Sequence, residues 1–392
     1  MKAVALRKLL VATIVLVGLA ATALPAAASG VTVYENGDKF VKIGGRIQLQ
    51  YHMVDPDDGE KTDDVFFRRL RPFIEGSVVK DWLGKFQFDL GDAEDENEIA
   101  VKDAFFQYSG VEHLKVTIGN AQFPFSREDM TSSKTQQLVE RTFVGDHNYG
   151  TPERNAGIFL HYAALEKKLE LHLAGGQADI DPDAKKLDFD TPVNANSDFN
   201  QGWIVGGRVD FHPMGYLKMA QGDFKRELKT TFSVAAFNWS NDDDNNTYTD
   251  EATGLPTSTS KADVDSVTAF EVSGAFRGYG LSIDAEYNLF QADTIDDNFT
   301  GGIYKDGSTD LTNYAVEGGY MIIPSKLELV AAYQAMDADN YDEVWTRTSF
   351  GANYFIHKND VKLQASYRIG NNLNGVKDND ENELFVQAQY VF

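Results

Sequence analysis

The chain has 392 residues, a formal net charge of −24 and no cysteine. Its acidic surplus repels a phosphate polymer, so we expect no nucleic-acid partner. Without cysteine there is no disulfide framework.

The first 28 residues are typical of a secretory signal peptide. Lys2, Arg7 and Lys8 give a positive start, an apolar stretch follows, and three alanines at 26–28 offer a cleavage site. A retained anchor is the alternative, but the apolar run is short for a membrane span. Cleavage would change the formal net charge from −24 to −27 by removing the three positive groups. We assign residues 29–39 to a short periplasmic segment and residues 40–392 to one domain.

Beyond residue 28 the chain alternates apolar and polar residues with a period of two. No later stretch approaches the roughly 18 apolar residues of a helical membrane span. The first alternating stretch, residues 40–52, puts Val41, Ile43 and Ile47 on one face and Lys42 and Arg46 on the other. The same pattern recurs at 66–79, 84–90, 114–119, 157–162, 168–174, 202–211, 230–237, 266–276, 280–290, 313–323, 326–333, 345–356, 361–370 and 383–392. Counting hairpins, the pattern predicts about sixteen strands of roughly ten residues, a length that suits a tilted crossing of a bilayer.

The connections between these stretches are of two kinds. Long acidic loops at 55–64, 92–98, 241–251, 292–298, 337–343 and 377–383 alternate with tight turns at 80–84, 109–113, 277–280, 323–326 and 357–360. Outer-membrane barrels have long external loops and short periplasmic turns. Aromatic residues gather near strand ends, as in an interfacial girdle, and the chain ends on Phe392. We therefore predict an all-β fold, a closed antiparallel transmembrane barrel in the bacterial outer membrane. Its apolar face would meet lipid, its polar face would meet water in a lumen, and both chain ends would be periplasmic.

Seven short stretches carry a family resemblance. They are IGGRIQ, FFRRLR, KDW, VKDAFFQYSG, TSSK, VER and the closing QYVF. In this order and spacing the chain resembles the phosphate-selective porin O and P family over nearly all of its mature length, most densely from residue 43 to residue 158. The resemblance implies a trimeric porin whose third long loop, here within residues 122–155, folds into the barrel and narrows the pore.

The resemblance also implies which residues line the constriction. Arg68 and Arg69 match the family's paired arginines, and Asp103 matches the acidic residue of the facing strand. In the loop, the matching residues are Ser132, Ser133, Lys134 and Arg141. Guanidinium, hydroxyl and ammonium groups can replace the hydration shell of an oxyanion. The alternative is that each arginine is a solvated side chain of the lumen without a binding role. Strand alternation sends Arg68 and Arg69 to opposite faces unless one lies at a loop end or a bulge.

Two positions depart from the family pattern. By this resemblance, Asp129 and Leu83 each stand at a position where anion-selective relatives have a lysine. Alternation places further lumen charges at Arg46, Arg71, Arg208, Arg347 and Arg368, with several inward carboxylates between them. We therefore predict passive diffusion of small anions such as phosphate, with a weak anion preference.

Three other functions stay open at this point. A general porin with no selectivity or a weak cation preference follows if the acidic residues dominate. A structural barrel that sheathes or docks an envelope partner would conduct poorly. An enzyme is disfavoured because the histidines are scattered and no G-x-S-x-G or H-x-x-E-H motif occurs. We expect no cofactor or metal. The expected partners are outer-membrane lipid and lipopolysaccharide, small anionic solutes and two further copies of the chain.

Overall fold

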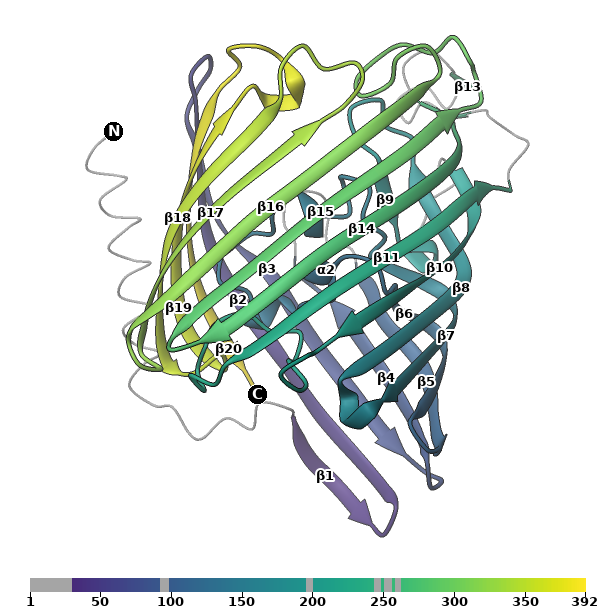
Figure 1. Ribbon diagram of the computed structural model, residues 1–392, viewed down its shortest axis with the longest axis vertical. Coiled ribbons are helices and arrows are strands. Elements are labelled where there is room, and N and C mark those ends of the chain that lie inside the picture. The colour runs from purple at the N-terminus through teal and green to yellow at the C-terminus, as the bar shows by residue number, and fades with distance from the viewer. Residues whose placement is uncertain (1–29, 92–98, 195–199, 243–247, 250–255, 258–261) are drawn as a thin grey trace.

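The computed structural model describes residues 30–91, 99–194, 200–242, 248–249, 256–257 and 262–392. Within these residues, sixteen antiparallel strands each pair with the next barrel strand, and the last pairs with the first, so the sheet closes into a barrel (Figure 1). These strands are β2 (Lys39–Pro56), β3 (Thr62–Ser77), β4 (Trp82–Asp89), β5 (Ala100–Val111), β6 (Leu114–Gln122), β7 (Arg154–Ala164), β8 (Leu169–Asp181), β10 (Asn200–Phe211), β11 (Lys229–Asn241), β14 (Val264–Gly278), β15 (Leu281–Thr294), β16 (Ser308–Ile323), β17 (Leu327–Asp337), β18 (Trp345–His357), β19 (Val361–Asn371) and β20 (Glu381–Val391). The predicted all-β barrel of about sixteen strands is confirmed.

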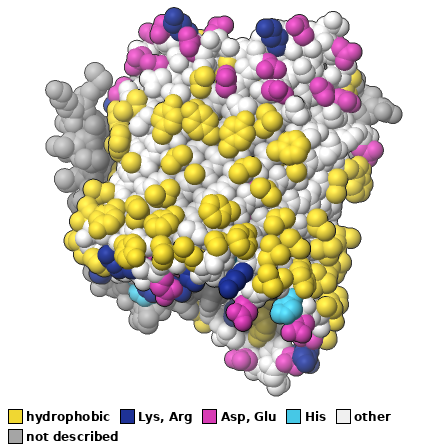
Figure 2. Space-filling view, viewed as in Figure 1, with side chains coloured by type: hydrophobic (Ala, Val, Ile, Leu, Met, Phe, Trp, Pro, Cys, Tyr) yellow, Lys and Arg dark blue, Asp and Glu magenta, His cyan; other side chains and the backbone are white. Residues whose placement is uncertain are grey.

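The period-two pattern produces an apolar outer surface. Along β11, Phe232 and Val234 are 61% and 52% exposed, whereas the alternate residues Thr231 and Ser233 are buried inside. Figure 2 shows hydrophobic side chains across the middle of the barrel wall, with charged groups gathered towards its two ends. This is the surface that a bilayer requires of a barrel.

The two ends of the barrel differ in their connections. The long connections lie at one end, here called the loop end, and the tight turns lie at the other, the turn end. Both ends of the barrel sequence meet at the turn end, where the backbone N–H of Gly45 donates to the carbonyl of Phe392 at 2.9 Å. One turn-end connection, residues 212–228, is long, contrary to the predicted alternation. It is held inward because Asp223 accepts a hydrogen bond from the N–H of Gly280 at 2.7 Å.

The remaining elements are short. Within the predicted N-terminal segment, β1 (Val31–Asn36) pairs with the start of β2 and forms a hairpin that projects past the turn end (Figure 1). The others are β9 (Asp188–Asp190), β12 (Tyr248–Thr249), β13 (Pro256–Thr257), α2 (Arg127–Met130), η2 (Ser133–Thr135), η3 (Phe143–Gly145), η4 (Leu165–Lys167), η5 (Pro192–Asn194) and η6 (Leu373–Gly375). Among the described residues no helix is long and apolar enough to cross a membrane. The predicted signal peptide lies outside the described residues, as do loop residues 92–98 and 243–247.

The expectation of a polar inner face throughout is wrong. On β10, β11 and β15, the inward residues Ile204, Phe237, Trp239 and Phe290 are at most 3% exposed. They form one apolar core with further buried residues, among them Phe123, Phe125, Phe143, Phe189, Val267 and Leu311. Part of the inner face of these strands is therefore apolar as well, and this side of the barrel is filled with packed side chains.

Candidate functional site

Residues 123–153, between β6 and β7, form a segment inside the barrel, here called the inward loop. Its backbone N–H groups donate to wall side chains far along the sheet from β6 and β7. Val139 donates to Ser366 of β19 at 3.3 Å, and Phe143 donates to Gln334 of β17 at 2.8 Å. The Nζ of Lys362 donates to the carbonyl of Gln136 at 2.9 Å. The inward loop thus spans the interior from one wall to the other.

Two β-bulges bring extra charges to the inner wall. In the pairing of β2 with β3, Gln48 lies opposite Arg69 and Leu49 lies opposite Phe67, so Arg68 is the additional residue. In the pairing of β4 with β5, Lys102 is additional in the same way. A bulge places two consecutive side chains on the same face. Arg68 and Arg69 therefore both face the lumen, as do Lys102 and Asp103.

Two water-accessible cavities lie on the side of the inward loop away from the apolar core. The cavity nearer the loop end has a volume of about 450 Å³, and the cavity nearer the turn end about 420 Å³. Arg71 of β3 and Arg141 of the inward loop line both cavities. These two arginines mark the level at which one cavity meets the other.

Cations outnumber carboxylates in both linings. The loop-end cavity is lined by Arg68, Arg69, Arg71, Lys102, Arg141, Lys186, Arg347 and Arg368, and by Asp89, Glu140, Asp146, Glu153 and Glu383. The turn-end cavity is lined by Arg46, Arg71, Lys85, Lys134, Arg141 and Arg154, and by Glu75, Asp103 and Asp129. A surplus of positive groups in a narrow water-filled path attracts anions.

Many of these cations already have a carboxylate partner. The Nε of Arg68 donates to Glu140 at 2.9 Å, and Arg71 forms a short hydrogen-bonded ion pair with Asp89. Burial by itself would raise the pKa of Glu140, but Arg68 and Arg69 beside it lower that pKa to about 2. Glu140 is therefore ionised at neutral pH and neutralises Arg68.

Near the turn end, Asp103 lies between two cations. The Nζ of Lys85 is 2.6 Å from one carboxylate oxygen, and the Nε of Arg154 is 2.9 Å from the other. Because both oxygens are occupied by cations, Asp103 repels a passing anion less than an unpaired carboxylate would.

Asp129 is a buried residue that neutralises Arg141. The Nη1 of Arg141 lies 3.2 Å from its carboxylate, and the Nε2 of Gln122 donates to it at 2.8 Å. Burial raises the pKa of Asp129, and Arg141 opposes that shift. The negative charge that departs from the family pattern thus acts on the arginine shared by the two cavities.

Among the described residues, five cavity cations have no carboxylate within ion-pair distance: Arg46, Arg69, Lys134, Lys186 and Arg347. The Nη1 of Arg46 donates to the hydroxyls of Ser132 at 3.2 Å and Ser133 at 2.6 Å. Arg69 donates to the side chain of Gln48 at 3.3 Å, and its Nε has no partner. These groups keep a net positive charge and donors for an incoming anion.

Aromatic rings fix the two arginines nearest the loop end. The guanidinium carbon of Arg347 lies 4.3 Å from the ring centre of Phe143 and 4.5 Å from that of Trp345. The guanidinium of Arg368 lies 5.0 Å from the ring centre of Phe385. Cation–π contacts of this kind hold both guanidinium groups in place. The charge of Arg347 stays uncompensated, whereas Arg368 also pairs with Glu383 at 3.2 Å.

A comparison with protein-family models matches residues 41–392 to the model described as phosphate-selective porin O and P. The chain belongs to this family. It is a porin, which agrees with the closed barrel, the inward loop and the cavities along one wall.

Solved structures with a similar fold include an outer-membrane protein, an outer-membrane channel and a porin. The trimer form of the outer-membrane protein OmpT of Vibrio cholerae has a TM-score of 0.57 at 16% identity, covering 90% of this chain and 99% of that one. The outer-membrane channel DcaP of Acinetobacter baumannii has a TM-score of 0.59 at 14% identity, covering 92% and 100%. An anion-selective porin from Comamonas acidovorans has a TM-score of 0.59 at 11% identity, covering 90% and 100%. A search of curated proteins finds no match. The family and the fold identify an outer-membrane channel rather than an enzyme.

The structure brings most of the predicted site residues of this porin together. The exception among the predicted lumen charges is Arg208. It is fully buried on the filled side, where it contacts Asp210 at 3.0 Å and Glu271 at 3.1 Å, and it lines neither cavity.

Sequence reasoning missed one set of cavity residues, the carboxylates that neutralise the arginines and lysines. They are Asp89, Glu140, Glu153 and Glu383. The cavity cations Lys85, Lys102, Arg154 and Lys186 were missed as well. The position of Asp89 in an alternating stretch could have indicated an inward carboxylate. No pattern in the chain indicates that Glu140 pairs with Arg68, because the two are far apart in sequence.

Proposed function

We propose that this porin is a passive diffusion channel for small anions. The observation that supports the proposal is the row of cations without carboxylate partners, which includes Arg347 near the loop end, Arg69 in the loop-end cavity, and Arg46 with Lys134 in the turn-end cavity. A dissolved anion moving along this path meets uncompensated positive charge in both cavities.

The turn-end cavity fits a small tetrahedral oxyanion such as phosphate. Arg46 presents a guanidinium beside the hydroxyls of Ser132 and Ser133, and the ammonium of Lys134 lines the same cavity. These donors can replace part of the hydration shell of phosphate at low cost. Asp129 and Asp103 line the cavity as well, so the binding is weak enough to allow release.

We further propose that residues 1–28 direct export, that the loop end faces outward, and that the channel works as a homotrimer. The similar fold of the trimeric form of OmpT from Vibrio cholerae supports the last point.

Phosphate block of the chloride current tests the site. In planar bilayers, added phosphate should reduce the chloride current of the wild type. Lys134→Ala and Arg46→Gln should each weaken this block by about ten- to a hundredfold, because each removes a charge-assisted contact worth roughly 1.5–3 kcal/mol. Lys377→Ala is the matched control, since Lys377 is exposed in a loop and lines neither cavity. Equal block in all four proteins would reject the turn-end site and leave a general porin.

A further inference from the structure

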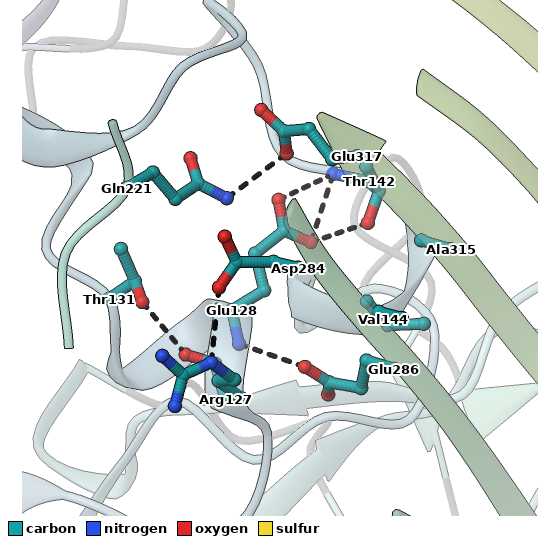
Figure 3. A pocket seen from close by; sticks show the side chains of 11 residues that line it. Arg127, Glu128, Thr131, Thr142, Val144, Gln221, Asp284, Glu286, Ala315 and Glu317 are labelled. Carbon is teal, nitrogen blue, oxygen red and sulfur yellow. Dashed lines mark hydrogen bonds and ion pairs between the residues drawn. The ribbon is translucent and has the colours of Figure 1, made fainter. Parts of the chain in front are cut away.

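A small cavity lies on the other side of the inward loop, away from the two large cavities. Figure 3 shows its lining, which includes Glu128 of the inward loop, Glu286 of β15 and Glu317 of β16. Its volume is about 20 Å³, enough for one water molecule. The surrounding side chains are almost fully buried, so bulk water does not screen their charges.

The arginines around this cavity are already matched by carboxylates. Arg127 and Arg277 both contact Asp284, at 3.1 Å and 2.6 Å. Arg208 lies between Asp210 and Glu271. Three arginines thus face three carboxylates, and none of the three is within ion-pair distance of a further acid at this cavity.

Glu128, Glu286 and Glu317 are the carboxyl groups left over. They are 8%, 7% and 3% exposed, and among the described residues none has a cation within 4.0 Å. Within the described part of the chain, the Oε1 of Glu286 has no hydrogen-bond partner. Buried carboxyl groups without a cation retain their protons, because ionising several of them together in a low-dielectric site is strongly unfavourable.

The same three groups fasten the inward loop. Glu286 accepts a hydrogen bond from the N–H of Glu128 at 2.9 Å, and Glu317 accepts one from the N–H of Leu138 at 3.2 Å. Glu128 accepts one from the N–H of Thr142 at 3.1 Å. The contact of the inward loop with β15 and β16 therefore depends on carboxyl groups that repel one another once they lose their protons.

The 212–228 connection also holds the inward loop through hydrogen bonds of Gln221. The side chain of Gln221 accepts a hydrogen bond from the N–H of Gln137 at 2.6 Å and donates one to Glu317 at 3.0 Å. Its backbone N–H donates to the carbonyl of Thr135 at 3.1 Å. Glu317 of β16 thus contacts both the inward loop and the 212–228 connection.

We propose that Glu286 and Glu317 are positioning residues of the pore, and that protons held among them and Glu128 keep the inward loop against β15 and β16. When these protons are lost, the inward loop separates from β15 and β16. One side of the loop lines the small cavity and the other side, with Glu140 and Arg141, lines the large cavities. A displaced loop therefore moves into the ion path and closes it.

The sign of the pH dependence follows from Glu128. Burial raises its pKa to about 7, even though its bonds to Thr142 act in the opposite direction. A carboxyl group whose pKa is raised by folding stabilises the folded arrangement below its ordinary pKa, and this contribution is lost as the pH rises through the folded value. The other charged groups that face the three acids are Arg127, Arg141, Asp146, Arg208, Asp210, Glu271, Arg277, Asp284, Glu328 and Lys362.

Single-channel recordings of the full chain test this proposal, whichever ion carries the current. Wild-type channels should stay open for long intervals at about pH 6 and lose them, with frequent closures, at about pH 9. Glu286→Gln and Glu317→Gln keep the acceptor oxygen and cannot ionise. Each variant should move the onset of closures to higher pH, and the double variant should remain open at about pH 9.

Glu343→Gln, at an exposed loop position, is the control and should close like the wild type. Closures at about pH 9 that are the same in the double variant and the wild type would overturn the proposal. If the double variant does not fold, the wild type alone decides, because an open time that is constant from about pH 6 to about pH 9 would also overturn it.

Discussion

At the residue scale, the charge that an anion meets depends on partners rather than on residue type alone. Arg68 and Arg69 are consecutive, yet Arg68 pairs with Glu140 and Arg69 has no carboxylate partner among the residues that the structure describes. The sequence predicted that cations and a few acids gather at the constriction. It could not predict which cation each acid neutralises, because those contacts join residues far apart in the chain.

Removing the partner of Arg68 should strengthen anion preference. Glu140→Gln keeps a hydrogen-bond acceptor for Arg68 but removes a buried negative charge from the loop-end cavity. A change of ~1 kcal/mol in the energy of an anion there corresponds to about fivefold in the permeability ratio of anion to cation. Reversal potentials in a salt gradient measure this ratio. The exposed variant Glu343→Gln should leave it unchanged, and an unchanged ratio in Glu140→Gln would contradict the assigned pairing.

Asp129→Asn should have its effect on phosphate. It leaves the side chain able to bond Gln122 but frees Arg141, the arginine shared by both cavities. We expect phosphate to block chloride current at lower concentration in this variant than in the wild type. A weaker block in Asp129→Asn would show that Asp129 serves chiefly to hold Arg141 in place.

At the scale of elements, two bulges and one inward loop shape the two large cavities, which we propose as the ion path. Alternation in the sequence predicted the strands and which faces they expose. A bulge breaks alternation by one residue, and the sequence FFRRLR fits either a bulge or a regular strand. The sequence did not indicate that part of the lumen is filled. Phe237 and Trp239 point inward there, but they belong to an apolar pattern that on other strands faces lipid.

The position of the bulge predicts which single-residue deletions in β3 still allow the barrel to assemble. Deleting Arg68 removes the additional residue and leaves Phe67 outside and Arg69 inside, so the barrel should still assemble. Deleting Ile74, which pairs regularly with Ile43, turns every later side chain of the strand to the opposite face. Heat-modifiable migration on gels reports barrel assembly. Assembly of both variants, or of neither, would contradict the register.

The inward loop should set the size of the ion path. Deleting residues 132–140 removes Glu140 and the contacts of Leu138 and Val139 with the wall, while β6 and β7 remain joined. Unit conductance should rise above that of the wild type. An unchanged conductance in a correctly assembled barrel would mean that ions do not pass beside the loop.

At the scale of the whole molecule, the lumen is divided. An apolar core and an ion-paired cluster fill the side near β10 to β16, and the water-accessible cavities lie along β2 to β6 and β18 to β20. The acidic groups that give the chain its charge of −24 lie mostly in loops, so the net charge says little about the path that ions take.

The central claim is that positive charge along this path outweighs negative charge. The reversal potential of wild-type channels in a gradient of potassium chloride tests it most directly, because chloride and potassium have nearly equal mobility in water. We predict a potential of the sign that shows chloride to be more permeant, with a smaller value in Arg69→Ala. A potential of the opposite sign, showing potassium to be more permeant, would contradict the claim and make this chain a general porin with a cation preference.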